Sequence, residues 1–89
     1  MEEKKILETA IRVFGDKHQE EKCIEELAEL ICAIAHKHCG RDANVSEEIA
    51  DVLIMLEQLI LINDCREEVN GIKYHKLMRL QERIFDECL

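Results

Sequence analysis

The sequence reads KCIEELAELICAIAHKH at residues 22–38 and SEEIADVLIMLEQLILI at residues 46–62. Each stretch contains two acids three residues apart, Glu26 and Glu29 in the first and Glu48 and Asp51 in the second, followed by an apolar run. On a helix, such residues point only about 60° from one another, so each pair presents two carboxylates in nearly the same direction. If the helices pack side by side, the four carboxylates converge, and such a group needs bound cations or raised pKa values. Mg²⁺ is the simplest cation, with Mn²⁺ as a substitute.

The rest of the chain also has a helical pattern. It contains no proline and three glycines, which stand where helices are expected to stop. The pattern predicts an all-α fold of four helices in a single domain, residues 1–89. We expect the helices to cover residues 3–14, 18–38, 46–68 and 72–88, with Ser46 as the N-cap of the third helix and Asn70-Gly71 at its end.

The third predicted helix is apolar on nearly all sides. One stripe carries Val52 and Met55 in line with the two acids, and neighbouring faces are apolar as well. Since 89 residues can hardly bury such a helix, we expect this helix to form an interface between subunits. The acids in line with the apolar stripe should be partly buried, and a structural salt bridge to Lys22 or Lys37 is the alternative to a metal ion.

Composition excludes several classes of function. The formal charge of -8 argues against a protein that grips a nucleic acid polymer through its phosphates. The N-terminus lacks the apolar region of a signal peptide, and the apolar run at residues 52–62 is interrupted and too short to span a membrane. We therefore expect a cytoplasmic protein with no membrane contact.

Five cysteines without a CxxC motif fit a reducing compartment, where most would serve as small core residues. A zinc site made from the run of Cys32, His36, His38 and Cys39 is an alternative, because ligands three or four residues apart lie along one helix face.

Basic and polar side chains near the acids could bind a phosphate. Gln19 and Lys22 share a face with the first acidic pair. Lys73, Lys76 and Arg79 belong to the fourth predicted helix, beside an apolar stripe, where long basic side chains otherwise extend to water. Glu25 is rotated by about 100° from Glu26 and is a secondary ligand candidate.

These motifs resemble a known family, the MazG-like all-α nucleoside triphosphate pyrophosphohydrolases, whose signature is ExxE followed after a gap by ExxD. The surroundings look like the short, phage-associated branch: Phe14-Gly15, Gln19, residues 22–30 and 47–56, and Lys76-Leu-x-Arg-Leu80. The resemblance extends from about Phe14 to Ile84.

The resemblance implies hydrolysis of a nucleoside triphosphate to the monophosphate and pyrophosphate. Glu26, Glu29, Glu48 and Asp51 would be the Mg²⁺ ligands and catalytic residues, and one of them, or Glu25, would orient or deprotonate the attacking water. The family also implies a four-helix bundle completed by oligomerisation, as a homodimer or a dimer of dimers.

Two alternatives differ in chemistry. Phosphoribosyl-ATP pyrophosphohydrolase shares the fold and both motifs, but it usually carries a Tyr-His pair after the second motif, where this chain has Val52-Leu-Ile. A non-catalytic helical interaction module would use the acids only to bridge subunits, and Mg²⁺ would then not change its thermal stability.

Overall fold

The computed structural model of the protein describes residues 1–88, and its secondary structure is helical throughout. The helices are α1 (Glu3–Phe14), α2 (Asp16–His38), α3 (Val45–Asn63) and α4 (Arg66–Cys88). Within residues 1–88 there is no β-strand. The predicted all-α class with four helices is confirmed.

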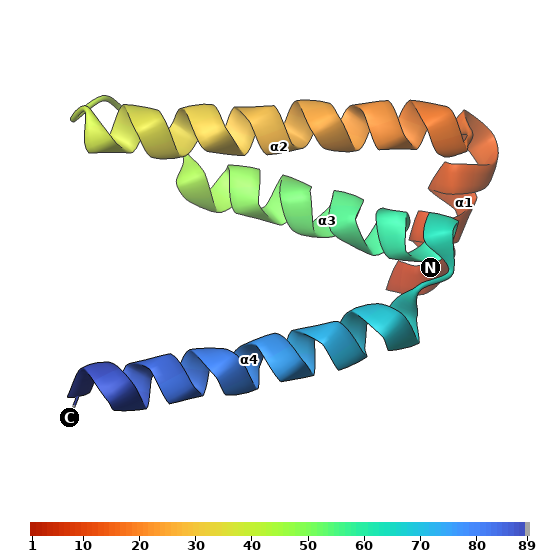
Figure 1. Cartoon of the computed structure of the whole chain (residues 1–89). Coiled ribbons are helices and arrows are strands. Elements are labelled where there is room, and N and C mark those ends of the chain that lie inside the picture. Colours follow the sequence, from red (N-terminus) through yellow and green to blue (C-terminus); the bar gives the residue numbers. More distant parts are fainter. Residues whose placement is uncertain (89) are drawn as a thin grey trace.

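The centre of the fold is the antiparallel pair of α2 and α3 (Figure 1). α1 packs against both helices at the end where α2 begins and α3 ends. α4 leaves from the same end, contacts only α3 among the described helices, and diverges from the pair toward the C-terminus (Figure 1). The buried apolar side chains form a small core, made by Leu7, Cys23, Ala33, Val52 and Met55.

The turn between α1 and α2 explains why α1 ends as predicted. Gly15 has a φ of 93°, a value that side chains with a Cβ rarely adopt. Its carbonyl accepts the N–H of Gln19 at 3.1 Å, so Gly15 is also the N-cap of α2. α2 therefore begins at Asp16, two residues before the predicted start.

The prediction that Ser46 caps α3 is wrong. Asn44 is the N-cap: its Oδ1 accepts the N–H of Glu47 at 3.1 Å, and its Nδ2 donates to the Glu47 carboxylate at 3.0 Å. Because the helix begins at Val45, Ser46 lies inside the first turn and cannot occupy the cap position.

The predicted boundary between the third and fourth helices is also wrong. α3 ends at Asn63 because Asp64 adopts the left-handed conformation, with φ 48° and ψ 51°, and the N–H of Cys65 bonds to the Ile60 carbonyl at 3.2 Å. α4 starts at Arg66 and continues through Gly71, where the expected break does not occur. A glycine inside a helix costs only about 1 kcal/mol relative to alanine, which a 23-residue helix tolerates.

The chain is more extended than a compact domain of its length. Its radius of gyration is 16.5 Å, whereas about 12 Å is expected. Its accessible surface is 7378 Å², which exceeds the value for a compact 10.4 kDa monomer by about 2,000 Å². α4, none of whose described residues is buried, contributes to this excess, as do exposed apolar side chains of the other helices. No helix in the part of the chain described by the structure combines enough length and apolar character to cross a lipid bilayer.

Candidate metal site between α2 and α3

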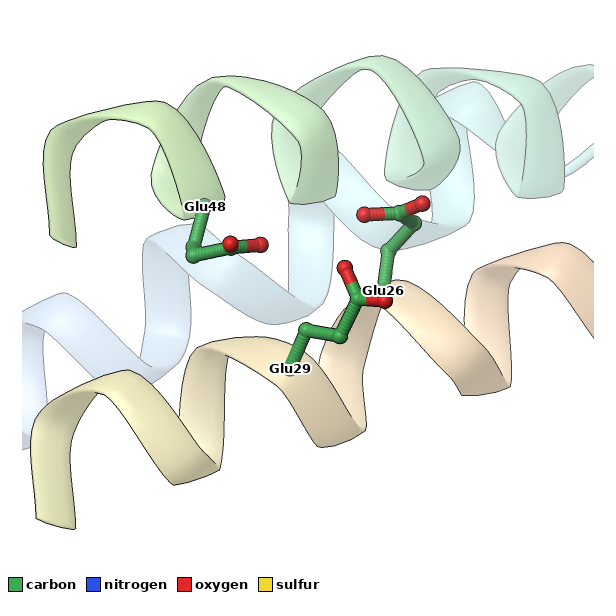
Figure 2. A group of neighbouring side chains, drawn as sticks. All are labelled: Glu26, Glu29 and Glu48. Carbon is green, nitrogen blue, oxygen red and sulfur yellow. The ribbon is translucent and has the colours of Figure 1, made fainter. Parts of the chain in front are cut away.

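Three carboxylates meet between the central helices. Glu26 and Glu29 extend from α2 and Glu48 extends from α3 into the space between them (Figure 2). Each offers one oxygen, and these oxygens all lie within 4.8 Å of one another. The predicted convergence of the two acidic motifs is therefore seen for three of the four acids.

The carboxylates are only partly compensated by the protein. Glu26 is 9% exposed and Glu48 is half-buried. The Oε2 atoms of both residues are buried and have no hydrogen-bond partner. Because buried polar atoms are nearly always paired, two orphan oxygens in one cluster call for an explanation, such as an ion.

Electrostatics act most strongly on Glu26. Its burial raises the pKa of the carboxyl group, and the neighbouring charges of Glu29 and Asp51 raise it further, against the opposing effect of Lys22. Asp51 is half-buried and repels Glu26, but it does not join the three carboxylates within 4.8 Å.

Lys22 lies at the edge of this group. Its Nζ is 3.4 Å from Glu25 and 3.6 Å from Glu26. Both carboxylates raise the pKa of the ammonium group, and Glu25 has the larger effect. In residues 1–88, neither Glu48 nor Asp51 forms the alternative salt bridge to Lys22 or Lys37. Glu25 is exposed and points its charge to Lys22 rather than to the three carboxylates.

Gln19, which the sequence suggested as a contact for the ligand, is buried, and its amide group is hydrogen-bonded to other side chains. Its Nε2 donates to Gln58 Oε1 at 2.7 Å, and its Oε1 lies 2.8 Å from His18 Nδ1. Sequence reasoning missed Gln58, which is 3% exposed. Its spacing, three residues after Met55 and seven after Asp51, was the available signal that it belongs to the α2-facing side of α3.

The basic residues of α4 lie apart from the acids in a single chain. Lys73, Lys76 and Arg79 are all exposed, and α4 does not contact α2. An apolar hollow along α4 is lined by Val69, Ile72, Lys73, Lys76, Leu77, Leu80 and Arg83.

The cysteines do not form the alternative zinc site. Among the described residues, Glu26, Glu29 and Glu48 are the only histidine, cysteine or acidic side chains that gather as a possible metal-binding group. All five thiols are free. Only Cys23 is buried, while Cys32, Cys39 and Cys88 are exposed, so the prediction that most cysteines serve in the core is wrong.

Comparison of the chain with protein-family models, curated proteins and solved structures gives no match in any of the three. Carboxylate oxygens without protein donors are the ligands of hard cations such as Mg²⁺, which binds one or two carboxylates and retains several waters. The residues present fit such an ion.

Proposed function

We propose that the chain is a Mg²⁺-dependent nucleoside triphosphate pyrophosphohydrolase, which converts a ribo- or deoxyribonucleoside triphosphate and water to the monophosphate and pyrophosphate. One observation carries the proposal: Glu26 and Glu48 place orphan buried oxygens in a carboxylate cluster between two helices. The resemblance of both acidic motifs to the MazG-like family supports the same reading.

The protein residues have separate roles in this proposal. Glu26, Glu29 and Glu48 would hold the cation, and Asp51 would complete the ligand set from the adjacent turn of α3. Bound Mg²⁺ supplies charge neutralisation for the phosphates and lowers the pKa of a coordinated water. The carboxylates would orient the attacking water and accept its proton as the anhydride bond breaks and pyrophosphate leaves.

The phosphates of the substrate also need cations from the protein. Residues 69–83 carry four basic side chains and one acidic one, whereas residues 1–65 carry the whole formal charge of -8. Lys73, Lys76 and Arg79 are therefore proposed to contact the triphosphate, together with Lys22 at the edge of the acids. The amide of Gln19, already bonded to Gln58, is a weaker candidate than these four.

We further propose that two copies of the chain assemble through α3 and α4. The excess surface of about 2,000 Å² compares with the roughly 800 Å² that each partner buries in a stable interface. Exposed apolar side chains on α4, such as Leu77 and Leu80, and on α3, such as Leu53, would supply the contact. The basic side chains of one copy could then reach the acidic group of the other, because the two parts attract each other.

The first test measures pyrophosphate release from a panel of ribo- and deoxyribonucleoside triphosphates, with Mg²⁺ or with EDTA. The proteins are the wild type, Glu48→Gln and, as a matched control, Glu20→Gln, which removes an exposed charge of α2 outside the cluster. We expect metal-dependent release from the wild type and the control, and loss of release in Glu48→Gln. Full activity of Glu48→Gln would refute the site assignment, and activity on phosphoribosyl-ATP alone would favour the alternative enzyme.

A helical interaction module is the second candidate, and the uncovered apolar side chains of α4 favour it. The two functions differ in their response to metal. An enzyme of the proposed kind should be stabilised by Mg²⁺, whereas the module should show the same melting temperature with Mg²⁺ and with EDTA.

A further inference from the structure

A buried pair of amides joins α2 to α3 beside the acidic group. Gln19 Nε2 donates to Gln58 Oε1 at 2.7 Å, and the two residues are 6% and 3% exposed. Gln58 Nε2 in turn faces the Ile54 carbonyl of its own helix at 3.5 Å. A hydrogen bond between two buried side chains of different helices forms in one relative placement of the helices and is lost in others.

The position of this pair matches that of the acids. In two antiparallel helices, residues whose numbers have the same sum lie at the same height, because each residue advances both helices by 1.5 Å. Polar pairs that share the sum of 77 include Gln19 with Gln58, Glu26 with Asp51, and Glu29 with Glu48. The amide pair is thus seven residues from Glu26 on α2 and from Asp51 on α3, about 10.5 Å away and on nearly the same faces.

Other alignments would disperse the acids. A displacement by four residues in one direction places Glu26 opposite Met55 and Glu29 opposite Val52. A displacement by three in the other direction places Glu26 opposite Glu48 but leaves Glu29 opposite Val45. Each alternative separates at least one of the three carboxylates that now lie within 4.8 Å of one another from the other two.

Apolar spacing within the helix pair does not select one alignment. Apolar residues recur three and four apart along both α2 and α3, whereas outside the pair α1 contacts both helices and also opposes a shift. The six residues between the helices can span about 20 Å, which exceeds the 8–10 Å between packed helices and allows a shift of about 5 Å.

We infer that Gln19 and Gln58 are positioning residues whose hydrogen bond sets the register of α2 against α3 at which the two acidic motifs meet to bind metal. The inference rests on the metal site proposed above. The amide pair fills space between the helices and also selects their register. Apolar residues in its place would preserve the buried contact but remove the preference for one register.

The test replaces both amides with leucine in the full chain. For Gln19→Leu/Gln58→Leu we expect a melting temperature equal to or above that of the wild type, together with an Mn²⁺ affinity at least tenfold weaker by electron paramagnetic resonance. Nuclear Overhauser contacts between α2 and α3 should indicate more than one register in the double variant. Gln81→Leu, an exposed glutamine of α4, is the matched control and should leave all three measurements unchanged.

Each result has a defined meaning. A single set of α2–α3 contacts and an unchanged Mn²⁺ affinity in the double variant would overturn the inference. If the leucine variant does not fold, Gln19→Met/Gln58→Met repeats the test, and failure of both to fold would also overturn it, since the pair would then be needed for stability itself. Absence of Mn²⁺ binding by the wild type would refute the proposed function, while the interhelical contacts would still decide the register.

Discussion

Replacement of Glu48 by glutamine should make the metal-free protein more stable and the metal-bound protein less stable. Two unit charges 4.8 Å apart repel by about 1 kcal/mol in water and by about 3 kcal/mol at an effective dielectric constant of 20. Glu29 is exposed, so the lower value applies to its repulsion of Glu48, and any negative charge on Glu26 adds to it. A gain of about 1 kcal/mol in the free energy of unfolding raises the melting temperature of a domain of this size by about 4–8 °C.

Metal reverses the order of stability. A ligand present at about 100 times its dissociation constant stabilises the folded state by about 2.7 kcal/mol, and the variant has lost one of the carboxylates that would bind it. The assay is thermal unfolding followed by circular dichroism, in EDTA and in saturating Mg²⁺, at low salt.

The crossing of the two melting temperatures is the diagnostic result. Glu48→Gln should melt above the wild type in EDTA and below it in Mg²⁺, whereas Glu20→Gln should respond to Mg²⁺ as the wild type does. A variant that is less stable in EDTA, or that responds to Mg²⁺ like the wild type, would refute the reasoning.

Three further predictions concern pH, the α3–α4 corner and assembly. Because folding raises the pKa of Glu26, the folded protein binds a proton more readily than the unfolded chain. The stability of the wild type relative to Glu26→Gln should therefore rise as pH falls through the raised pKa. A difference in melting temperature that does not change with pH in metal-free buffer would contradict this prediction. Arg66 Nη1 lies 3.2 Å from Glu57 Oε1, and this pairing lowers the pKa of Glu57. Glu57→Gln should therefore lower the free energy of unfolding by at most about 1 kcal/mol at neutral pH, and by nothing once acid has protonated Glu57. Urea unfolding at the two pH values measures this difference. Leu80→Lys should yield monomers in light scattering if α4 forms the subunit interface, while the neighbouring Gln81→Lys should leave the oligomer intact.

Local patterns in the sequence were sufficient for much of the fold. α1 has the predicted bounds because Gly15 supplies a backbone conformation that ends a helix. The same reasoning failed at Gly71, which lies in α4, and missed Asp64, whose left-handed conformation ends α3. A glycine marks where a helix can stop, but tertiary contacts decide where it does.

The acidic group was predictable because helical spacing determines direction. The spacing placed Glu26 and Glu29 on one face, and the apolar stripe of α3 indicated that Glu48 faces a neighbour. Asp51 lies outside the group of three carboxylates, and Gln19 is hydrogen-bonded to Gln58. Both facts depend on the distance and alignment of the two helices, which cannot be predicted from the spacing of residues within one helix.

α4 is attached to the rest of the fold only near the turn at Asp64, where the helix begins. The helix has 23 residues and is about 35 Å long, and only its beginning is held, through the pair of Arg66 with Glu57. A rotation of about 10° at this corner moves the far end by about 6 Å, roughly one helical turn. Such a rotation would change the placement of the basic side chains of α4 relative to the acids, which lie between α2 and α3. If a second copy of the chain packs against α4 and fixes its position, turnover per chain should increase with protein concentration.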